Sequence, residues 1–179
     1  MQITVQGSPL SVLATGPSDA PPVLFIHGFP LSNDLWLEAS EALSDRFRCL
    51  LPDLRGHGNS LATGENYTIG RYADDLAELL AQLAPGKPAT VVGLSMGGTI
   101  ALEFFRAHGA HVRALGLVCC RSEAETPEGA TARRALIENV RTKGSIAAAD
   151  AMVDKVLGPS APPALRDRWH TIMRSTPPE

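Results

Sequence analysis

A serine lies in a glycine-rich segment whose spacing is typical of a catalytic nucleophile. The segment is Gly93-Leu94-Ser95-Met96-Gly97-Gly98, and it joins an expected strand to an expected helix. A sharp strand-to-helix turn strains the serine backbone and exposes its hydroxyl above the sheet, and Gly93 and Gly97 leave room for close backbone. The positive end of the helix dipole favours an oxyanion there. The spacing predicts that Ser95 is a nucleophile; the competing interpretation is a turn with a capping serine.

A second candidate segment is His27-Gly28-Phe29-Pro30, which follows the apolar run 23–26 directly. Acyl transfer needs two backbone N–H donors that stabilise a developing oxyanion. We expect one donor from Met96 and the other from Phe29, since proline has no N–H. Gly28 lets the loop turn sharply. The competing interpretation is a strand-ending turn with a packed histidine.

A third polar segment is Pro52-Asp53-Leu54-Arg55-Gly56-His57-Gly58-Asn59-Ser60. Here the structural interpretation is favoured over a catalytic one. We expect Asp53 and Arg55 to pair and hold the loop, and His57 to pack.

The elements that must position these segments alternate between short apolar runs and amphipathic stretches. This alternation predicts an α/β fold with a mostly parallel sheet of about six strands and flanking helices. Strands are expected at 3–5, 10–15, 23–26, 48–51, 89–93 and 112–120, helices at 35–44, 69–84 and 96–106, and a loop at 53–68. Asn33 or Asp34 should lie near the N-cap of the first helix. The apolar stripe of the helix at 69–84 leaves Asp74, Asp75 and Glu78 mostly outside it.

From Thr126 onward the pattern changes to three helix-like segments without a strand, and Thr126-Pro127 is a typical helix start. The sequence therefore predicts two regions, a sheet-containing region at 1–122 and a helical region at 123–179.

The composition excludes several classes of protein. The chain has 179 residues, a net charge of −3 and 44% hydrophobic residues, which fits one globular domain and argues against nucleic acid as a partner. We expect no membrane span, because no run approaches about 18 apolar residues. Three cysteines in apolar runs and the lack of signal-peptide features predict a cytoplasmic protein with reduced core thiols.

The three segments, in this order and spacing, resemble the α/β-hydrolase superfamily over residues ~20–120. The elbow and the short helical tail are similar to the β-ketoadipate enol-lactone hydrolase and small carboxylesterase branch, with the tail at 123–179 as a cap. Haloalkane dehalogenases and epoxide hydrolases carry aspartate at the position of Ser95, so the serine argues against those branches. The resemblance implies hydrolysis of a small-molecule carboxylic ester or lactone through an acyl-enzyme, without a metal or an organic cofactor. Acyltransferases, perhydrolases and C–C bond hydrolases share these motifs.

The resemblance also implies a triad acid and a triad histidine after two further strands, and the sequence has no match for either. The chain therefore resembles a truncated α/β-hydrolase fold that lacks its C-terminal third, and we expect weak or absent turnover from these 179 residues alone. His170 is a candidate base without an identifiable carboxylate partner, and Glu123 or Glu125 is a candidate acid. The alternative function is a catalytically inactive remnant that binds a small molecule or needs a partner chain.

The apolar strand expected at 112–120 would lie at the edge of such a truncated sheet. Unpaired N–H and C=O groups on an apolar edge tend to pair with another chain. We therefore expect self-association through this strand.

Overall fold

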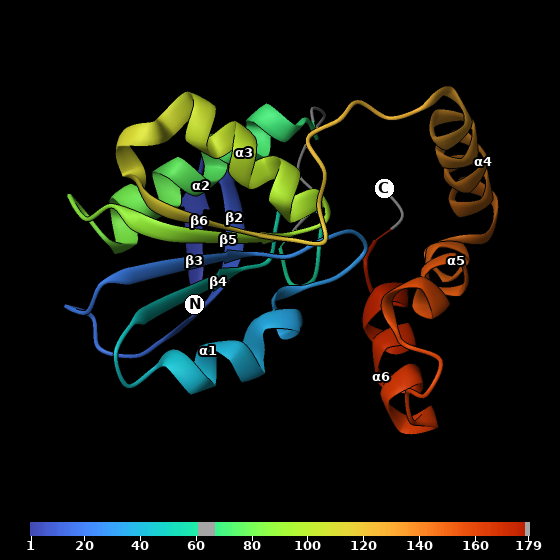
Figure 1. Ribbon diagram of the computed structural model, residues 1–179, viewed down its shortest axis with the longest axis horizontal. Helices are drawn as coiled ribbons and strands as arrows, with labels where there is room; N and C mark the ends of the chain where they lie inside the picture. Colours follow the sequence, from blue (N-terminus) through green and yellow to red (C-terminus); the bar gives the residue numbers. More distant parts are fainter. Residues whose placement is uncertain (61–66, 178–179) are drawn as a thin grey trace. The chain divides into compact units, whose positions relative to one another are not determined.

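The computed structural model describes residues 1–60 and 67–177 (Figure 1). Contacts divide the chain into two compact units, Met1–Arg121 and Ser122–Glu179. In the described part of the first unit the elements are β1 (Gln2–Val5), β2 (Ser8–Thr15), β3 (Pro22–Ile26), η1 (Asn33–Trp36), α1 (Leu37–Leu43), β4 (Arg48–Pro52), α2 (Ile69–Leu83), β5 (Ala89–Leu94), α3 (Met96–His108), η2 (Gly109–His111) and β6 (Val112–Val118). The second unit contains α4 (Pro127–Lys143), α5 (Ile146–Val156) and α6 (Pro163–Arg174).

The described strands form one sheet in the order β1-β2-β4-β3-β5-β6. The hairpin of β1 and β2 is antiparallel, and β2 also pairs antiparallel with β4. From β4 through β3 and β5 to β6 all pairings are parallel. The predicted α/β class and mostly parallel sheet are therefore confirmed. The parallel register brings the carboxyl ends of β4, β3, β5 and β6 to one edge of the sheet, where ligands bind in open α/β sheets.

Helices cover the sheet from both sides: α2 and α3 lie on one face and α1 on the other (Figure 1). The larger core cluster joins α2 and α3 to buried strand residues such as Leu24, Ile26 and Leu50. The smaller cluster packs Phe25 and Trp36 on the opposite face, with ring centroids 5.1 Å apart. Because β3 is buried along its whole length, its side chains contribute to both layers.

The first predicted helix begins differently from the expectation. Ser32 is the N-cap, and its hydroxyl accepts a hydrogen bond from the Asp34 N–H, so Asn33 and Asp34 lie inside the first turn. That turn is a 3₁₀-helix, and the α-helix starts only at Leu37. The serine hydroxyl satisfies an N–H that has no partner within the helix.

Two expectations about the end of β6 and the cysteines are wrong. The strand stops at Val118 instead of continuing to Cys120, because Cys119 has a φ of 47°, which is incompatible with a strand. Cys49 is buried as expected, whereas Cys119 is exposed and Cys120 is half-buried. Of the loop expected at 53–68, residues 53–60 are irregular, and 61–66 lie outside the described residues.

The helical unit begins as predicted, since the Thr126 hydroxyl accepts from the Gly129 N–H and Pro127 is in the first turn of α4. Two acidic residues one turn apart on α5 pair with two basic residues one turn apart on α6. Asp150 binds His170 with Oδ1 2.8 Å from Nε2, and Asp154 pairs with Arg166. His170 therefore has a carboxylate partner, which corrects the expectation that it had none.

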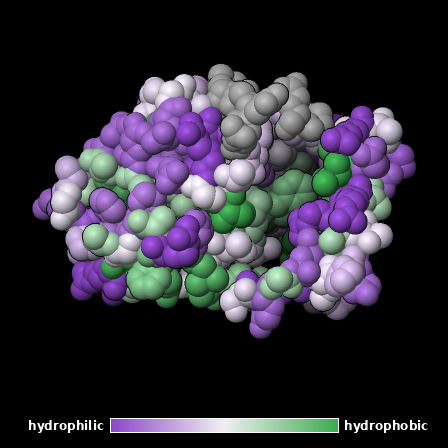
Figure 2. Space-filling model, turned by 90° about the horizontal axis from the view of Figure 1, so that it is seen from above, coloured by the Kyte–Doolittle hydropathy of each residue, from purple (hydrophilic) through white to green (hydrophobic). Residues whose placement is uncertain are grey.

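Strand β6 pairs with β5 and stands last in the order of the described sheet. Leu117 and Val118 on β6 and Phe105 on α3 are exposed. On the face of the molecule shown in Figure 2, hydrophobic and hydrophilic residues are interspersed. Self-association through this edge stays a prediction. No helix in the described residues is long and apolar enough to cross a membrane.

Replacing Leu117 with lysine is expected to lower self-association, because a charged side chain on an edge strand opposes pairing with a second copy. Sedimentation velocity at increasing protein concentration measures the change. Leu13→Lys is the matched control, since Leu13 is exposed on β2, a strand paired on both sides. A wild-type chain that sediments as a monomer at all concentrations would contradict the prediction.

Candidate active site

The turn between β5 and α3 holds Ser95 in a strained conformation. Its φ is 54° and its ψ is −115°, a region that residues other than glycine rarely adopt, and the residue is exposed. The Ser95 N–H donates to the Val118 carbonyl at 2.9 Å, and the Ser95 carbonyl accepts from the N–H groups of Gly98 and Thr99. The end of β6 and the first turn of α3 therefore fix the serine from both sides.

The two glycines that frame Ser95 are required by close backbone contacts. A Cβ at Gly93 would lie 2.2 Å from the Gly97 carbonyl oxygen, and a Cβ at Gly97 would lie 2.3 Å from the Ile26 carbonyl oxygen. Real Cβ atoms essentially never approach so closely, so any side chain here would push α3 away from β3. The predicted need for glycine at both positions thus has a direct steric cause.

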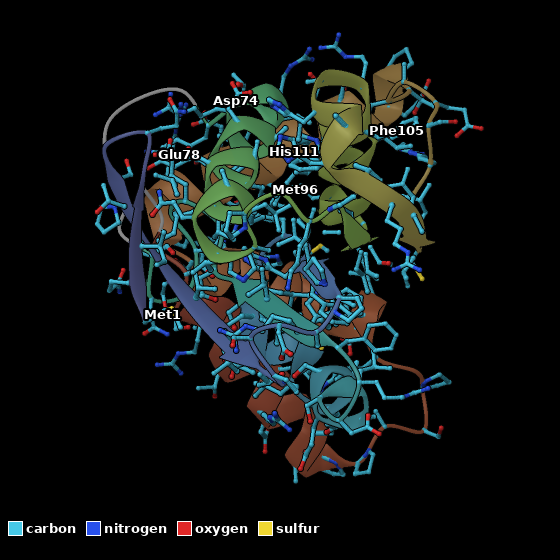
Figure 3. All side chains as sticks on the ribbon, turned by 90° about the vertical axis from the view of Figure 1, so that its left-hand side faces the viewer. Met1, Asp74, Glu78, Met96, Phe105 and His111 are labelled. Atoms are coloured by element: carbon cyan, nitrogen blue, oxygen red, sulfur yellow. The ribbon has the colours of Figure 1, made fainter. Side chains whose placement is uncertain are left out.

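The segment after β3 lies directly against this turn. A Cβ at Gly28 would be 3.0 Å from the Leu94 carbonyl oxygen and 3.3 Å from Ser95 Cβ, so the loop backbone contacts the nucleophile turn. Within residues 1–60 and 67–177, the N–H groups of Phe29 and Met96 donate to no acceptor. Figure 3 shows Met96 at the start of α3. The structure therefore brings together Ser95 and the two segments from which oxyanion donors were predicted.

His27 is completely buried and links two loops. Its Nδ1 donates to the Gly28 carbonyl at 3.0 Å, and its Nε2 accepts from the Leu54 N–H at 3.0 Å. This pair of hydrogen bonds requires the neutral imidazole. Burial, together with the nearby His57, lowers the pKa of His27 to about 3. These contacts agree with the interpretation of His27 as a packed histidine after β3.

The carboxylate of Asp53 organises the loop after β4. It accepts from the Asn33 N–H at 2.8 Å and the Asn59 N–H at 2.9 Å, and burial raises its pKa while these hydrogen bonds act to lower it. Gly58 has a φ of 52°, and a Cβ there would lie 2.4 Å from the Asp53 carboxyl carbon. Asp53 therefore binds backbone N–H groups instead of a cation.

Arg55 pairs with Asp75 on α2, not with Asp53 as predicted. The two side chains are buried and bidentate, with Nε 2.9 Å from Oδ2 and Nη2 2.8 Å from Oδ1, and Arg55 also contacts the Ser8 hydroxyl. The expectation that Asp75 lies off the buried stripe of α2 is wrong as well. Its spacing of three residues after Tyr72 and four before Leu79 placed it on that stripe, and this signal in the sequence was missed.

Two further histidines of the first unit, His108 and His111, follow α3 to its far end from Ser95. His108 is the last residue of α3, about 20 Å along a helix of this length, and its Nε2 lies 2.8 Å from Asp74 Oδ1. His111 follows it, and His170 belongs to the second unit. Among the described residues no cluster of three or more His, Cys, Asp or Glu side chains could hold a metal ion.

A family model described as the alpha/beta hydrolase fold matches residues 21–151, a stretch that includes all three segments. The chain belongs to the α/β-hydrolase fold family. This confirms the predicted family, and the agreement extends from the sheet to the turn that carries Ser95.

Two solved structures align with nearly all of this chain. An esterase from Thermogutta terrifontis, solved with malate bound, is 33% identical with a TM-score of 0.91, and the match covers 100% of this chain and 68% of the esterase. An enol-lactonase from Burkholderia xenovorans is 24% identical with a TM-score of 0.90, over 99% of this chain and 69% of the lactonase, which supports the fold alone.

One curated relative is not named as an esterase or a lactonase. The magnesium-chelatase 30 kDa subunit of Rhodobacter capsulatus is 41% identical over 93 residues, which are 51% of this chain and 32% of that subunit. The chain thus spans about a third of this curated relative. Because one α/β-hydrolase framework supports several activities, the activity of this chain has to be argued from its site.

Proposed function

We propose that this chain carries the nucleophile and the oxyanion-binding half of a serine hydrolase that acts on a carboxylic ester or lactone. The observation that carries the proposal is the strained, exposed Ser95 beside two backbone N–H groups, those of Phe29 and Met96, without acceptors in the described residues. The similarity to the Thermogutta esterase, at 33% identity, supports the same reaction class.

The reaction would proceed through an acyl-enzyme. Ser95 Oγ forms a bond to the carbonyl carbon while its proton moves to a base, and the carbonyl oxygen becomes an oxyanion held by the Phe29 and Met96 N–H groups. The C–O bond to the alcohol then breaks, and the alcohol leaves with the proton from the base. Attack by water on the acyl group, with proton transfer to the same base, releases the acid and restores the serine. The residues of this site need no metal or organic cofactor for these steps.

The base and the acid that orients it are proposed to come from outside these 179 residues, either from further chain or from a second polypeptide. Two His–carboxylate pairs occur in the described residues, His108 with Asp74 and His170 with Asp150. The first is at the far end of α3 from Ser95, and the second belongs to the helical unit, which we propose to be a cap that shapes the substrate site.

Labelling with a fluorophosphonate probe, followed by intact mass, tests this proposal. Ser95 attacks phosphorus and displaces fluoride, a step that needs a base and an oxyanion hole. We expect slow labelling of the wild-type chain, acceleration by added imidazole acting as an external base, and no labelling of Ser95→Ala. Ser18→Ala, at an exposed serine in a distant loop, is the matched control and should label like the wild type.

Each result decides one part of the proposal. Fast stoichiometric labelling without imidazole would show that these 179 residues already supply a base, which would overturn the proposal that the base comes from outside them. Failure to label even with imidazole would overturn the proposed activity and favour the inactive, ligand-binding remnant.

A further inference from the structure

His57 lies in the loop after β4 and is 6% exposed. Its Nδ1 donates to the Arg55 carbonyl at 3.1 Å, so the unprotonated nitrogen is Nε2. That atom is buried and has no hydrogen-bond partner in the described residues. Burial lowers the pKa of His57, although the Arg55 carbonyl and Asp53 act to raise it, so the ring is neutral at neutral pH. One hydrogen bond therefore anchors the imidazole, and the orientation of the ring otherwise depends on packing.

The packing around His57 is aromatic and joins three elements. The ring centroid of His27 lies 5.2 Å away, that of Phe29 lies 6.2 Å away, and that of Tyr72 on α2 lies 6.4 Å away. The Phe29 and His57 planes are almost perpendicular, at 86°, which is the favourable edge-to-face arrangement of aromatic rings. His57 thus stands between α2 and the segment after β3, and it contacts both residues that flank Gly28.

The anchor of His57 is itself rigid. The Arg55 carbonyl that accepts from His57 also accepts from the Tyr72 hydroxyl at 3.4 Å, and the Arg55 side chain is bound to Asp75 of α2. Movement of the imidazole relative to α2 is therefore restricted. Phe29, by contrast, is half-buried and lies in an irregular loop, so its orientation depends on the rings that it contacts.

We propose that His57 is a positioning residue for the oxyanion donor Phe29 and acts through the edge-to-face contact of the two rings. This inference rests on the proposed function and adds a specific support for the Phe29 N–H. Catalytic donors must be held within about 0.5 Å of the productive geometry. The ring contact transmits that restraint from α2, to which the anchor of His57 is bound.

Two substitutions separate the ring from its hydrogen bond. His57→Phe keeps an aromatic ring against Phe29 and removes both polar atoms, including the buried unpartnered Nε2. His57→Gln can still donate to the Arg55 carbonyl but loses the ring. His108→Gln is the matched control, because His108 also packs against a phenylalanine, with centroids 5.5 Å apart, at the far end of α3.

The test measures kinact and KI for fluorophosphonate labelling of Ser95, with saturating imidazole in every reaction. For His57→Gln we expect kinact to fall about 10- to 100-fold with KI unchanged, because misplacement of an oxyanion donor raises the barrier without weakening binding. His57→Phe should stay within about threefold of the wild type, and His108→Gln should equal it. An equal loss in His57→Phe and His57→Gln, or no loss in His57→Gln, would overturn the proposal.

A second readout does not depend on reactivity. In ¹H–¹⁵N spectra the Phe29 amide should shift in His57→Gln and stay close to its wild-type position in His57→Phe and His108→Gln. If wild-type Ser95 never labels, the proposed activity fails while this readout still decides whether His57 positions Phe29. An unchanged Phe29 amide in His57→Gln would overturn the positioning role whatever the labelling shows.

Discussion

Replacement of Asp75 by asparagine is expected to lower the free energy of unfolding of the sheet-containing unit by about 3–5 kcal/mol. The substitution keeps the shape of the side chain but removes the Asp75 carboxylate from the buried Arg55 guanidinium, and removal of one partner of a buried ion pair has effects of this size. Urea unfolding followed by Trp36 fluorescence measures the change. The chain has two tryptophans, so a Trp169→Phe background restricts the signal to Trp36, which packs on the sheet.

The neighbouring residue provides a matched control. Asp74→Asn is the same substitution one position earlier, and Asp74 is exposed on α2 (Figure 3) and pairs with His108. An exposed pair contributes at most about 1 kcal/mol, so this variant should unfold nearly like the wild type. Equal effects of Asp74→Asn and Asp75→Asn would show that the loss comes from the charge of α2 and not from the buried pair.

A double variant tests the physical reason. Arg55→Met combined with Asp75→Leu removes both charges and leaves apolar side chains in their place. Such a replacement of a buried pair is often neutral or stabilising. We expect the double variant to be more stable than Asp75→Asn alone. If it is less stable, the hydrogen bonds of Arg55 beyond Asp75 carry the stability.

The partner of Arg55 could not be predicted from the sequence. Asp53 lies two residues from Arg55 and Asp75 lies twenty residues away, so local spacing favoured the wrong carboxylate. The choice is made by tertiary packing: the Asp53 oxygens are occupied by the Asn33 and Asn59 N–H groups, and α2 turns Asp75 toward the loop. Long-range partners of this kind depend on how helices pack on the sheet, which a single sequence does not specify.

The nucleophile turn was predictable for the opposite reason. Its glycines are needed by contacts within a few residues or with the adjacent strand, so the constraint is written directly into residue types. The end of β6 was not, because Val118, Cys119 and Cys120 are uniformly apolar and only the backbone angle of Cys119 stops the strand. The partner of His170 required knowledge of how α5 and α6 align, since Asp150 lies twenty residues away.

Acidification from pH 7.5 to pH 5 is expected to lower the free energy of unfolding of the wild-type chain by about 2 kcal/mol through His27 alone. The pKa of His27 is about 3 in the folded chain against an ordinary value of 6.5, so between these values the unfolded chain binds more protons. Stability contributed by the neutral imidazole is therefore complete above pH 6.5 and is lost progressively as the pH falls toward 3. Urea midpoints at pH 7.5, 6 and 5, again read by Trp36, give the dependence.

The buried ionisable groups around the site change the free energy of unfolding in different directions as the pH falls. His57 acts in the same direction as His27, because burial lowers its pKa too. Asp53 acts in the opposite direction, since its raised pKa lets the folded chain take up that proton first as the pH falls. His27→Gln, whose amide oxygen can still accept from the Leu54 N–H, should flatten the pH dependence, whereas His111→Gln at an exposed position should not.

A wild-type chain as stable at pH 5 as at pH 7.5, or a His27→Gln variant with an unchanged slope, would contradict the assignment of His27 as a neutral, doubly hydrogen-bonded group. Protonation of His27 would place a second N–H against the Leu54 N–H, so the two loops that flank the nucleophile turn would separate at that point. The folded chain protonates His27 only near pH 3, so loss of Ser95 labelling through this imidazole should begin at a lower pH than the loss of stability, which begins where the unfolded chain takes up the proton near pH 6.5.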